Sequence, residues 1–224
     1  TFPYPVYAAW AAAYKAETGA AVNYQSIGSG AGVRQIRAGT VDFGATDRPL
    51  KAADLAKAGL VQWPQVMGAL VAVYNLPGIG AGELVLDGAT LAGIYLGKIR
   101  HWRDPAIRAL NPALDLPDRA IGVVRRSDGA GTTFLFTDYL SRVSAEWRSG
   151  PGAGTAVEWP VGVGARGNEG VAANVQQTRY AIGYVEHAIA RHARLSYAAL
   201  RNRAGRIVRP EAASIRSAAA HADW

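Results

Sequence analysis

Three short stretches of the chain combine small or hydroxyl-bearing residues with the expected start of a helix: Thr1–Pro3, Gly28–Gly30 and Gly129–Thr132. The first backbone N–H groups of a helix have no acceptor within the helix, so they attract anions, and hydroxyl groups add further donors. One such stretch is explained equally well by ordinary helix capping. Three of them in one chain, with an arginine beside one, indicate an oxyanion site.

The third stretch lies within RRSDGAGTTF, residues 125–134, where charge accompanies the donors. Arg126 offers a guanidinium fork that can bind an oxyanion through charge-assisted hydrogen bonds. Asp128 alone would be interpreted as a turn or cap residue, and as a partner it would orient Arg126. Neither GSGAGV nor RSDGAGTT has the register of a dinucleotide loop or the lysine of a Walker loop, which disfavours a nucleotide enzyme.

Asp47 ends the stretch VDFGATD and could select among oxyanions. Taken alone it is more simply a cap for the helix that follows. Inside an anion site, however, a carboxylate repels the ligand unless the ligand has a proton to donate. Phosphate has such a proton at neutral pH and sulfate does not, so Asp47 would discriminate against sulfate.

The elements that must position these residues alternate in type. Hydrophobic periodicity and cap residues predict helices at residues 5–18, 33–39, 50–59, 89–97, 104–110, 132–143, 169–178 and 210–222. Strands are expected at residues 20–28, 41–46, 66–75, 120–124, 156–162 and 181–186. Strand, turn and helix in series favour an α/β fold with ligands at the carboxyl ends of the strands.

A break in this pattern near residues 75–83 predicts two lobes. Residues 1–75 would form the first lobe and residues 76–224 the second. The first lobe has few strands for a stable sheet of its own, so we expect it to be incomplete.

Composition excludes several classes of function. The 224 residues carry a net charge of +7, but the arginines are scattered and not interleaved with aromatic residues, which disfavours nucleic-acid binding. The chain has no cysteine and its four histidines lie far apart, so we expect no metal and no cofactor. No apolar run is long enough to cross a membrane.

Six segments together resemble one protein family: TFPYPVYAAW, YQSIGSGAGVRQI, TVDFGATDRPL, LVLDGATLAGIYLGKI, VVRRSDGAGTTFLFTDYLS and AIGYVE. They are similar to the periplasmic phosphate-binding proteins of ABC-type phosphate transporters, in order and over nearly the whole chain. The resemblance implies a type II periplasmic-binding fold, with two α/β lobes and a ligand cleft between them. Its phosphate-binding positions fall on Thr1, Phe2, Ser29, Asp47, Arg126, Ala130, Gly131 and Thr132, with Asp128 as the partner of the site arginine.

The sequence departs from this family pattern at three places. Ala130 stands where the family usually has a serine, so one hydroxyl donor is missing, although the Ala130 N–H could still donate. The glycine-rich lead-in before Thr1 is absent. The chain also stops at HADW, where family members continue with a portion that completes the first lobe, so we expect a fragment.

We therefore expect a monomeric, exported receptor, periplasmic or at the cell surface, that passes inorganic phosphate to an ABC-type permease. The signal segment would be absent from this chain. A receptor for another oxyanion, such as sulfate or molybdate, is the alternative. A phosphatase-like enzyme is less favoured, because no histidine lies near the three motifs and no metal-ligand spacing appears.

Overall fold

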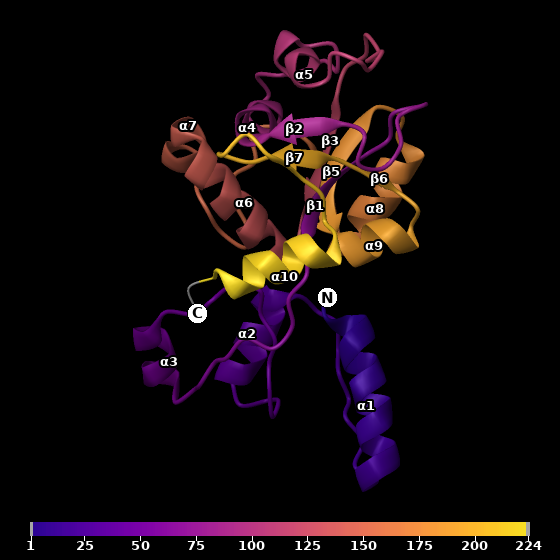
Figure 1. The fold of residues 1–224 in the computed structure, drawn as a ribbon. Coiled ribbons are helices and arrows are strands. Elements are labelled where there is room, and N and C mark those ends of the chain that lie inside the picture. The colour runs from indigo at the N-terminus through magenta and orange to yellow at the C-terminus, as the bar shows by residue number, and fades with distance from the viewer. Residues whose placement is uncertain (1, 223–224) are drawn as a thin grey trace.

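The computed structural model describes residues 2–222, which form both helices and strands (Figure 1). The helices are α1 (Tyr4–Thr18), α2 (Ser29–Arg37), α3 (Ala52–Ala58), α4 (Gly88–Tyr95), α5 (Pro105–Leu110), α6 (Gly131–Val143), α7 (Ala145–Ser149), α8 (Gly167–Gln177), α9 (His187–His192) and α10 (Ala212–Ala220). The strands are β1 (Leu70–Tyr74), β2 (Val85–Asp87), β3 (Gly122–Arg126), β4 (Val163–Ala165), β5 (Ala181–Glu186), β6 (Ser196–Tyr197), β7 (Ala199–Arg201) and β8 (Ile207–Val208).

The main sheet has five strands in the order β4–β3–β5–β1–β6. Strand β3 runs parallel to β4 and β5, whereas β1 is antiparallel to β5 and β6. A second sheet contains β2, β7 and β8. The expected α/β architecture is confirmed, and the carboxyl ends of the parallel strands β3, β4 and β5 meet at one edge of the main sheet.

Two hydrophobic cores cover the two faces of the main sheet. Alternation along β1 sends Val71 and Val73 to one core and Ala72 and Tyr74 to the other. The first of these cores is aliphatic, and the second is rich in aromatic rings. All six residues of β5 are buried, because the strand is covered on both sides. This packing fixes the ends of β3 and β5 where they form the site.

Residues 2–69 form an N-terminal segment that carries α1, α2 and α3 and lies to one side of the α/β body in Figure 1. No strand forms among these described residues, so the expected strands at 20–28 and 41–46 are wrong. An extended segment becomes a strand only when a neighbouring strand bonds its N–H and C=O groups, and neither segment has such a neighbour. Many apolar side chains here are exposed, including Val61 at 81% and Trp63 at 62%.

The body follows the expected elements more closely. The helix at α5 begins as expected, with Asp104 accepting a hydrogen bond from the Ala106 N–H at 2.9 Å. The strand expected at 156–162 is wrong, and β4 forms just after it. Pro160 has no N–H to give to a strand ladder, and Trp159 stacks on Tyr184 instead, with ring centroids 5.8 Å apart.

No helix within residues 2–222 is both long and apolar enough to span a bilayer. The lobe boundary at residue 75 stays a prediction.

Candidate anion-binding site

Two helices that are far apart in the sequence begin at the same place in space. Helix α2 starts at Ser29 and helix α6 starts at Gly131. The backbones meet in direct contact here, since a Cβ added to Gly28 or Gly30 would lie 3.3 Å or 3.2 Å from the carbonyl oxygen of Gly129. A side chain at either position would press on this carbonyl, and Gly28 also has a positive φ of 83°, which favours glycine.

The first backbone N–H groups of both helices have no acceptor in the part of the chain that the structure describes. The first bonded N–H of α2 is that of Gly32, and the first of α6 is that of Phe134, each bonded to the carbonyl four residues earlier. The N–H groups of residues 29–31 and 131–133 therefore lack an acceptor within residues 2–222. Together with the positive ends of two helix dipoles, they favour an anion at this place.

Ser29 and Asp47 reach this place from the N-terminal segment. The Asp47 N–H donates to Ser29 Oγ at 3.1 Å, which leaves the Ser29 O–H available to a ligand. Gly131 lies against both residues, because an added Cβ would lie 2.3 Å from Asp47 Oδ2 and 2.3 Å from Ser29 Oγ. Burial raises the pKa of Asp47, and the positive charge of Arg126 opposes part of that rise.

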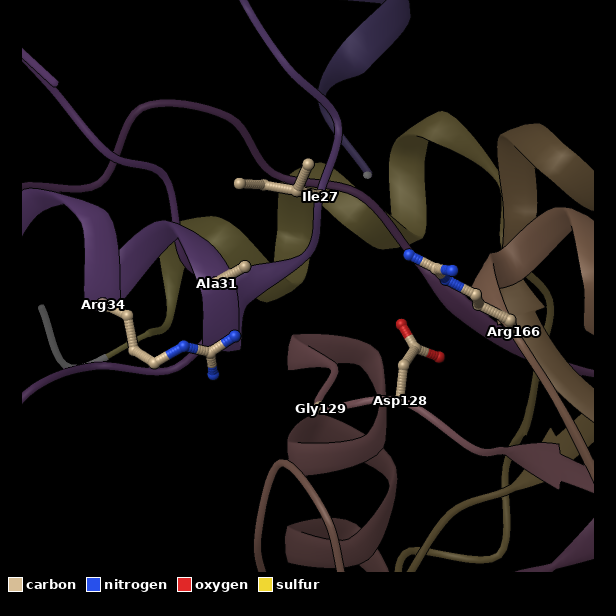
Figure 2. Close-up of a pocket in the computed structure, with 6 residues that line it drawn as sticks. All are labelled: Ile27, Ala31, Arg34, Asp128, Gly129 and Arg166. Atoms are coloured by element: carbon tan, nitrogen blue, oxygen red, sulfur yellow. The ribbon is translucent and has the colours of Figure 1, made fainter. Parts of the chain in front are cut away.

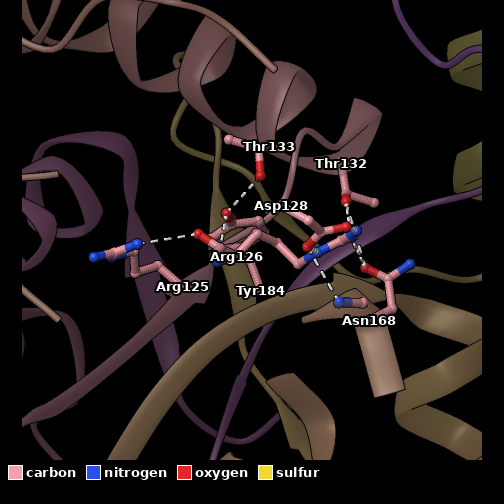
Figure 3. A network of polar contacts seen from close by, with 8 residues as sticks. Arg125, Arg126, Asp128, Thr132, Thr133, Asn168 and Tyr184 are labelled. Carbon is pink, nitrogen blue, oxygen red and sulfur yellow. Dashed lines mark hydrogen bonds and ion pairs between the residues drawn. The ribbon is translucent and has the colours of Figure 1, made fainter. Parts of the chain in front are cut away.

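The guanidinium of Arg126 is fully buried at the end of β3 and nearly saturated with acceptors (Figure 3). Nε and Nη2 donate to the two carboxylate oxygens of Asp128, at 2.8 Å and 2.6 Å. Nη1 donates to Thr132 Oγ1 at 2.7 Å and to Asn168 Oδ1 at 2.8 Å. Four of the five guanidinium N–H groups are thus used, and the fifth, on Nη2, has no acceptor within residues 2–222.

This geometry corrects one expectation for Arg126. The fork expected to bind an oxyanion is bound instead to Asp128, the partner that the resemblance implies, because Asp128 lies two residues after Arg126, just beyond the end of β3. Burial alone would raise the pKa of Asp128, but the hydrogen bonds and charge of Arg126 outweigh it and hold that pKa below its usual value. Asp128 therefore fixes the guanidinium, which keeps a single N–H for a ligand.

Two further residues support Arg126, and motif reasoning missed both. Asn168 is buried at the start of α8, next to Gly167, whose N–H donates to Asp128 Oδ1 at 3.2 Å. Tyr184 Oη on β5 accepts the Arg126 N–H at 3.2 Å and lies 2.8 Å from Thr133 Oγ1. Burial is the largest cause that raises the pKa of Tyr184 to about 12, so the phenol stays protonated. The strand-turn-helix pattern around VGARGNEG is the one signal that could have indicated Asn168.

Ala130 occupies the N-cap of α6 without a capping side chain. It is 1% exposed, and its N–H donates to the Thr155 carbonyl at 2.9 Å. The backbone donor that could have replaced the missing hydroxyl is therefore already engaged.

The remaining expected residues lie at the amino end of the chain. Thr1 lies outside the described residues. Phe2 packs its ring against Gly68, since an added Cβ there would lie 2.4 Å from Phe2 Cε2. The structure thus brings Ser29, Asp47, Arg126, Asp128, Gly131 and Thr132 into one cluster, with Ala130 beside it.

A cavity of about 360 Å³ opens beside this cluster (Figure 2). The N-terminal segment contributes Ile27, Ala31 and Arg34 to its lining, and the body contributes Asp128, Gly129 and Arg166. Arg34 and Arg166 are exposed and form no ion pair with any residue between 2 and 222. Asp128 is neutralised by Arg126, so the opening is positively charged and attracts anions.

Comparison with known proteins gives a consistent result. A family model described as the PBP superfamily domain matches residues 1–221. The phosphate-binding protein PstS of Pasteurella multocida is 56% identical over 224 residues, which cover 100% of this chain and 65% of that protein. PstS of Haemophilus influenzae is 54% identical over 100% of this chain and 67% of its own length.

The chain spans about two thirds of the length of these relatives. Among solved structures, a Clostridium perfringens protein with bound phosphate has a TM-score of 0.73 at 22% identity. The match covers 97% of this chain and 78% of that one, and it supports the fold.

Proposed function

Because the chain belongs to the PstS phosphate-binding proteins of the PBP superfamily, we propose that its anion site binds inorganic phosphate. The observation that carries this proposal is the buried guanidinium of Arg126 beside two helix starts whose first N–H groups have no acceptor among residues 2–222. The relatives named above are phosphate-binding proteins, which supports the same ligand.

Each side chain of the cluster has a distinct role in this proposal. Arg126 supplies positive charge and its last N–H, while the N–H groups at the starts of α2 and α6 donate to the phosphate oxygens. The Ser29 hydroxyl adds a donor from the N-terminal segment. The Thr132 hydroxyl adds a donor from the body. Its hydrogen bond to Asn168 Oδ1 is long, at 3.4 Å, so the hydroxyl can readily turn to donate to a phosphate oxygen.

Asp47 would make the site selective for a protonated anion. Its carboxylate can accept a hydrogen bond from phosphate, whereas sulfate at neutral pH has no proton to give. Burial leaves the negative charge of Asp47 poorly solvated, which also raises its pKa, so an oxyanion without a proton would meet unscreened repulsion.

Phosphate would bridge the N-terminal segment and the body, since each contributes donors. We propose that closure of the two parts on the ligand is the signal recognised by an ABC-type permease. The protein would act outside the cytoplasmic membrane, in the periplasm or at the cell surface, as a monomer. These assignments rest on the family and on the two-sided site.

Titration calorimetry at neutral pH tests the proposed ligand. We expect phosphate to bind at one site per chain and a tenfold excess of sulfate or molybdate over phosphate to leave its apparent affinity unchanged. Tight sulfate binding would contradict the role of Asp47 and favour a general oxyanion receptor. Phosphate release from a chromogenic ester would instead indicate an enzyme, and we expect none.

Replacing Ala130 by serine is expected to tighten phosphate binding about fivefold, or about 1 kcal/mol. A hydroxyl at this N-cap can accept an N–H from the first turn of α6 and donate its own proton to the ligand. Calorimetric titration of both proteins measures the change. Ala52→Ser, at the exposed start of α3, is the matched control. An equal or weaker affinity for Ala130→Ser would show that the missing hydroxyl is not what limits binding.

A further inference from the structure

Glu186 is a buried acid that the anion site described above does not use. It is the last residue of β5 and is 3% exposed. Its carboxyl group forms no hydrogen bond or ion pair with any residue between 2 and 222. An ionised carboxylate without a partner is costly to bury, so a carboxyl group in this setting favours its neutral, protonated form.

The topology brings Glu186 to the edge of the sheet that carries the site. Strands β3 and β5 are parallel neighbours, and they end at Arg126 and Glu186 respectively. Parallel strands that end together place their last residues at one edge. On the other side of β5, Glu186 pairs in register with Leu70, where the chain enters the sheet from the N-terminal segment.

The charged groups around Glu186 act on it in opposite directions. Burial is the largest influence and raises its pKa, and the negative charge of Asp47 raises it further. Positive charges, that of Arg126 among them, lower it, and the resulting pKa is about 8. Asp47 and Arg126 are the charged side chains within residues 2–222 that act on it. The adjacent His187 has a lowered pKa, owing to burial and to Arg191, so it does not titrate in the same range.

We propose that Glu186 holds a proton while the site binds its anion, and that loss of this proton weakens anion binding. In the protonated state, one guanidinium, Arg126, faces the two carboxylates of Asp47 and Asp128. Ionisation of Glu186 would add a third negative charge at the sheet edge, beside a ligand that is itself negative. Glu186 is thus a positioning residue that sets the alkaline limit of the site. This inference rests on the proposed phosphate binding.

The substitution Glu186→Gln tests the inference, because glutamine keeps the shape of a protonated glutamate and cannot ionise. Phosphate Kd values are measured by calorimetry for both proteins between pH 6.5 and 9.5. At pH 6.5 we expect the two proteins to bind phosphate with equal affinity. At pH 9.5 we expect the wild type to bind about tenfold more weakly than the variant, which corresponds to a ligand that shifts the Glu186 pKa by about one unit. The titration of phosphate itself cancels in the ratio of the two Kd values.

Glu211→Gln, at the exposed N-cap of α10, is the matched control for this substitution.

Unfolding by urea without phosphate provides an independent measurement. The folded protein holds the Glu186 proton more tightly than the unfolded chain does. Wild-type stability should therefore fall relative to Glu186→Gln as the pH rises from about 5 to about 8, and then level off. The relative unfolding constant should change by about tenfold per pH unit in that range.

The outcomes separate the two proposals. If neither protein binds phosphate at any pH, the proposed function fails, and the unfolding profiles alone decide whether Glu186 holds its proton. Parallel unfolding profiles overturn the inference. A Kd ratio that stays constant from pH 6.5 to 9.5 overturns it too, because the proton would then have no bearing on the ligand.

Discussion

Replacing Gly131 by alanine is expected to weaken phosphate binding about 100-fold, within the range of about 1–3 kcal/mol that an overpacked contact costs. The new methyl group would lie 2.3 Å from Asp47 Oδ2 and from Ser29 Oγ, so one side of the site must move. Gly131 begins α6 in the body, whereas both neighbours belong to the N-terminal segment. The methyl group would therefore hold the two parts of the site apart.

Gly129 and Gly30 provide a graded control for this effect. A Cβ at Gly129 would meet no atom within 4 Å, and one at Gly30 would lie 3.2 Å from the Gly129 carbonyl oxygen. Calorimetry should rank the loss of phosphate affinity as Gly129→Ala smallest, Gly30→Ala intermediate and Gly131→Ala largest. An equal loss at Gly129 and Gly131 would show that the flexibility of the loop matters and that the close contact does not.

Replacing Arg126 by lysine is expected to abolish measurable phosphate binding and to lower the free energy of unfolding by about 3 kcal/mol, because breaking a buried ion pair is strongly destabilising. Lysine keeps the positive charge, but it has three donors on one nitrogen. It cannot bond both oxygens of Asp128, Thr132 Oγ1 and Asn168 Oδ1 and still reach a ligand. Urea unfolding and calorimetry measure the two losses.

Arg142→Lys is the matched control for this substitution. Arg142 pairs with Asp138 one turn away on α6, but its side chain is 72% exposed. Solvent-exposed ion pairs contribute about 0–1 kcal/mol, so stability and phosphate affinity should hardly change. If Arg126→Lys were as mild as Arg142→Lys, charge alone would be sufficient and the fixed geometry of the guanidinium would be unnecessary.

Much of the body could be predicted from the sequence because its signals are local. Asp104 followed by Pro105 marks the start of α5, and the apolar runs of β1 and β5 mark strands that are buried on both faces. The residues expected to form the site in RRSDGAGTT and near Ser29 and Asp47 come together as a cluster. Helix starts, glycines and hydroxyl groups are recognisable within a few residues, so the type of site is encoded in short stretches.

The sequence alone did not reveal how the site's donors are shared. Asn168 takes one of the Arg126 N–H groups, and the Thr155 carbonyl takes the Ala130 N–H. Each of these choices depends on which groups lie within about 3 Å of one another, and for Asn168 and Thr155 the partner comes from a distant part of the chain.

The sequence by itself thus determined the α/β class, the family and most of the residues that come together in the cluster. The tertiary structure decided that residues 20–28 and 41–46 do not become strands, since no neighbouring strand bonds their backbones. It also decided that Glu186 is buried at the end of the strand beside Arg126. Propensity and capping act over a few residues, whereas strand pairing, burial and the pKa of a buried acid depend on segments that meet only when the chain is folded.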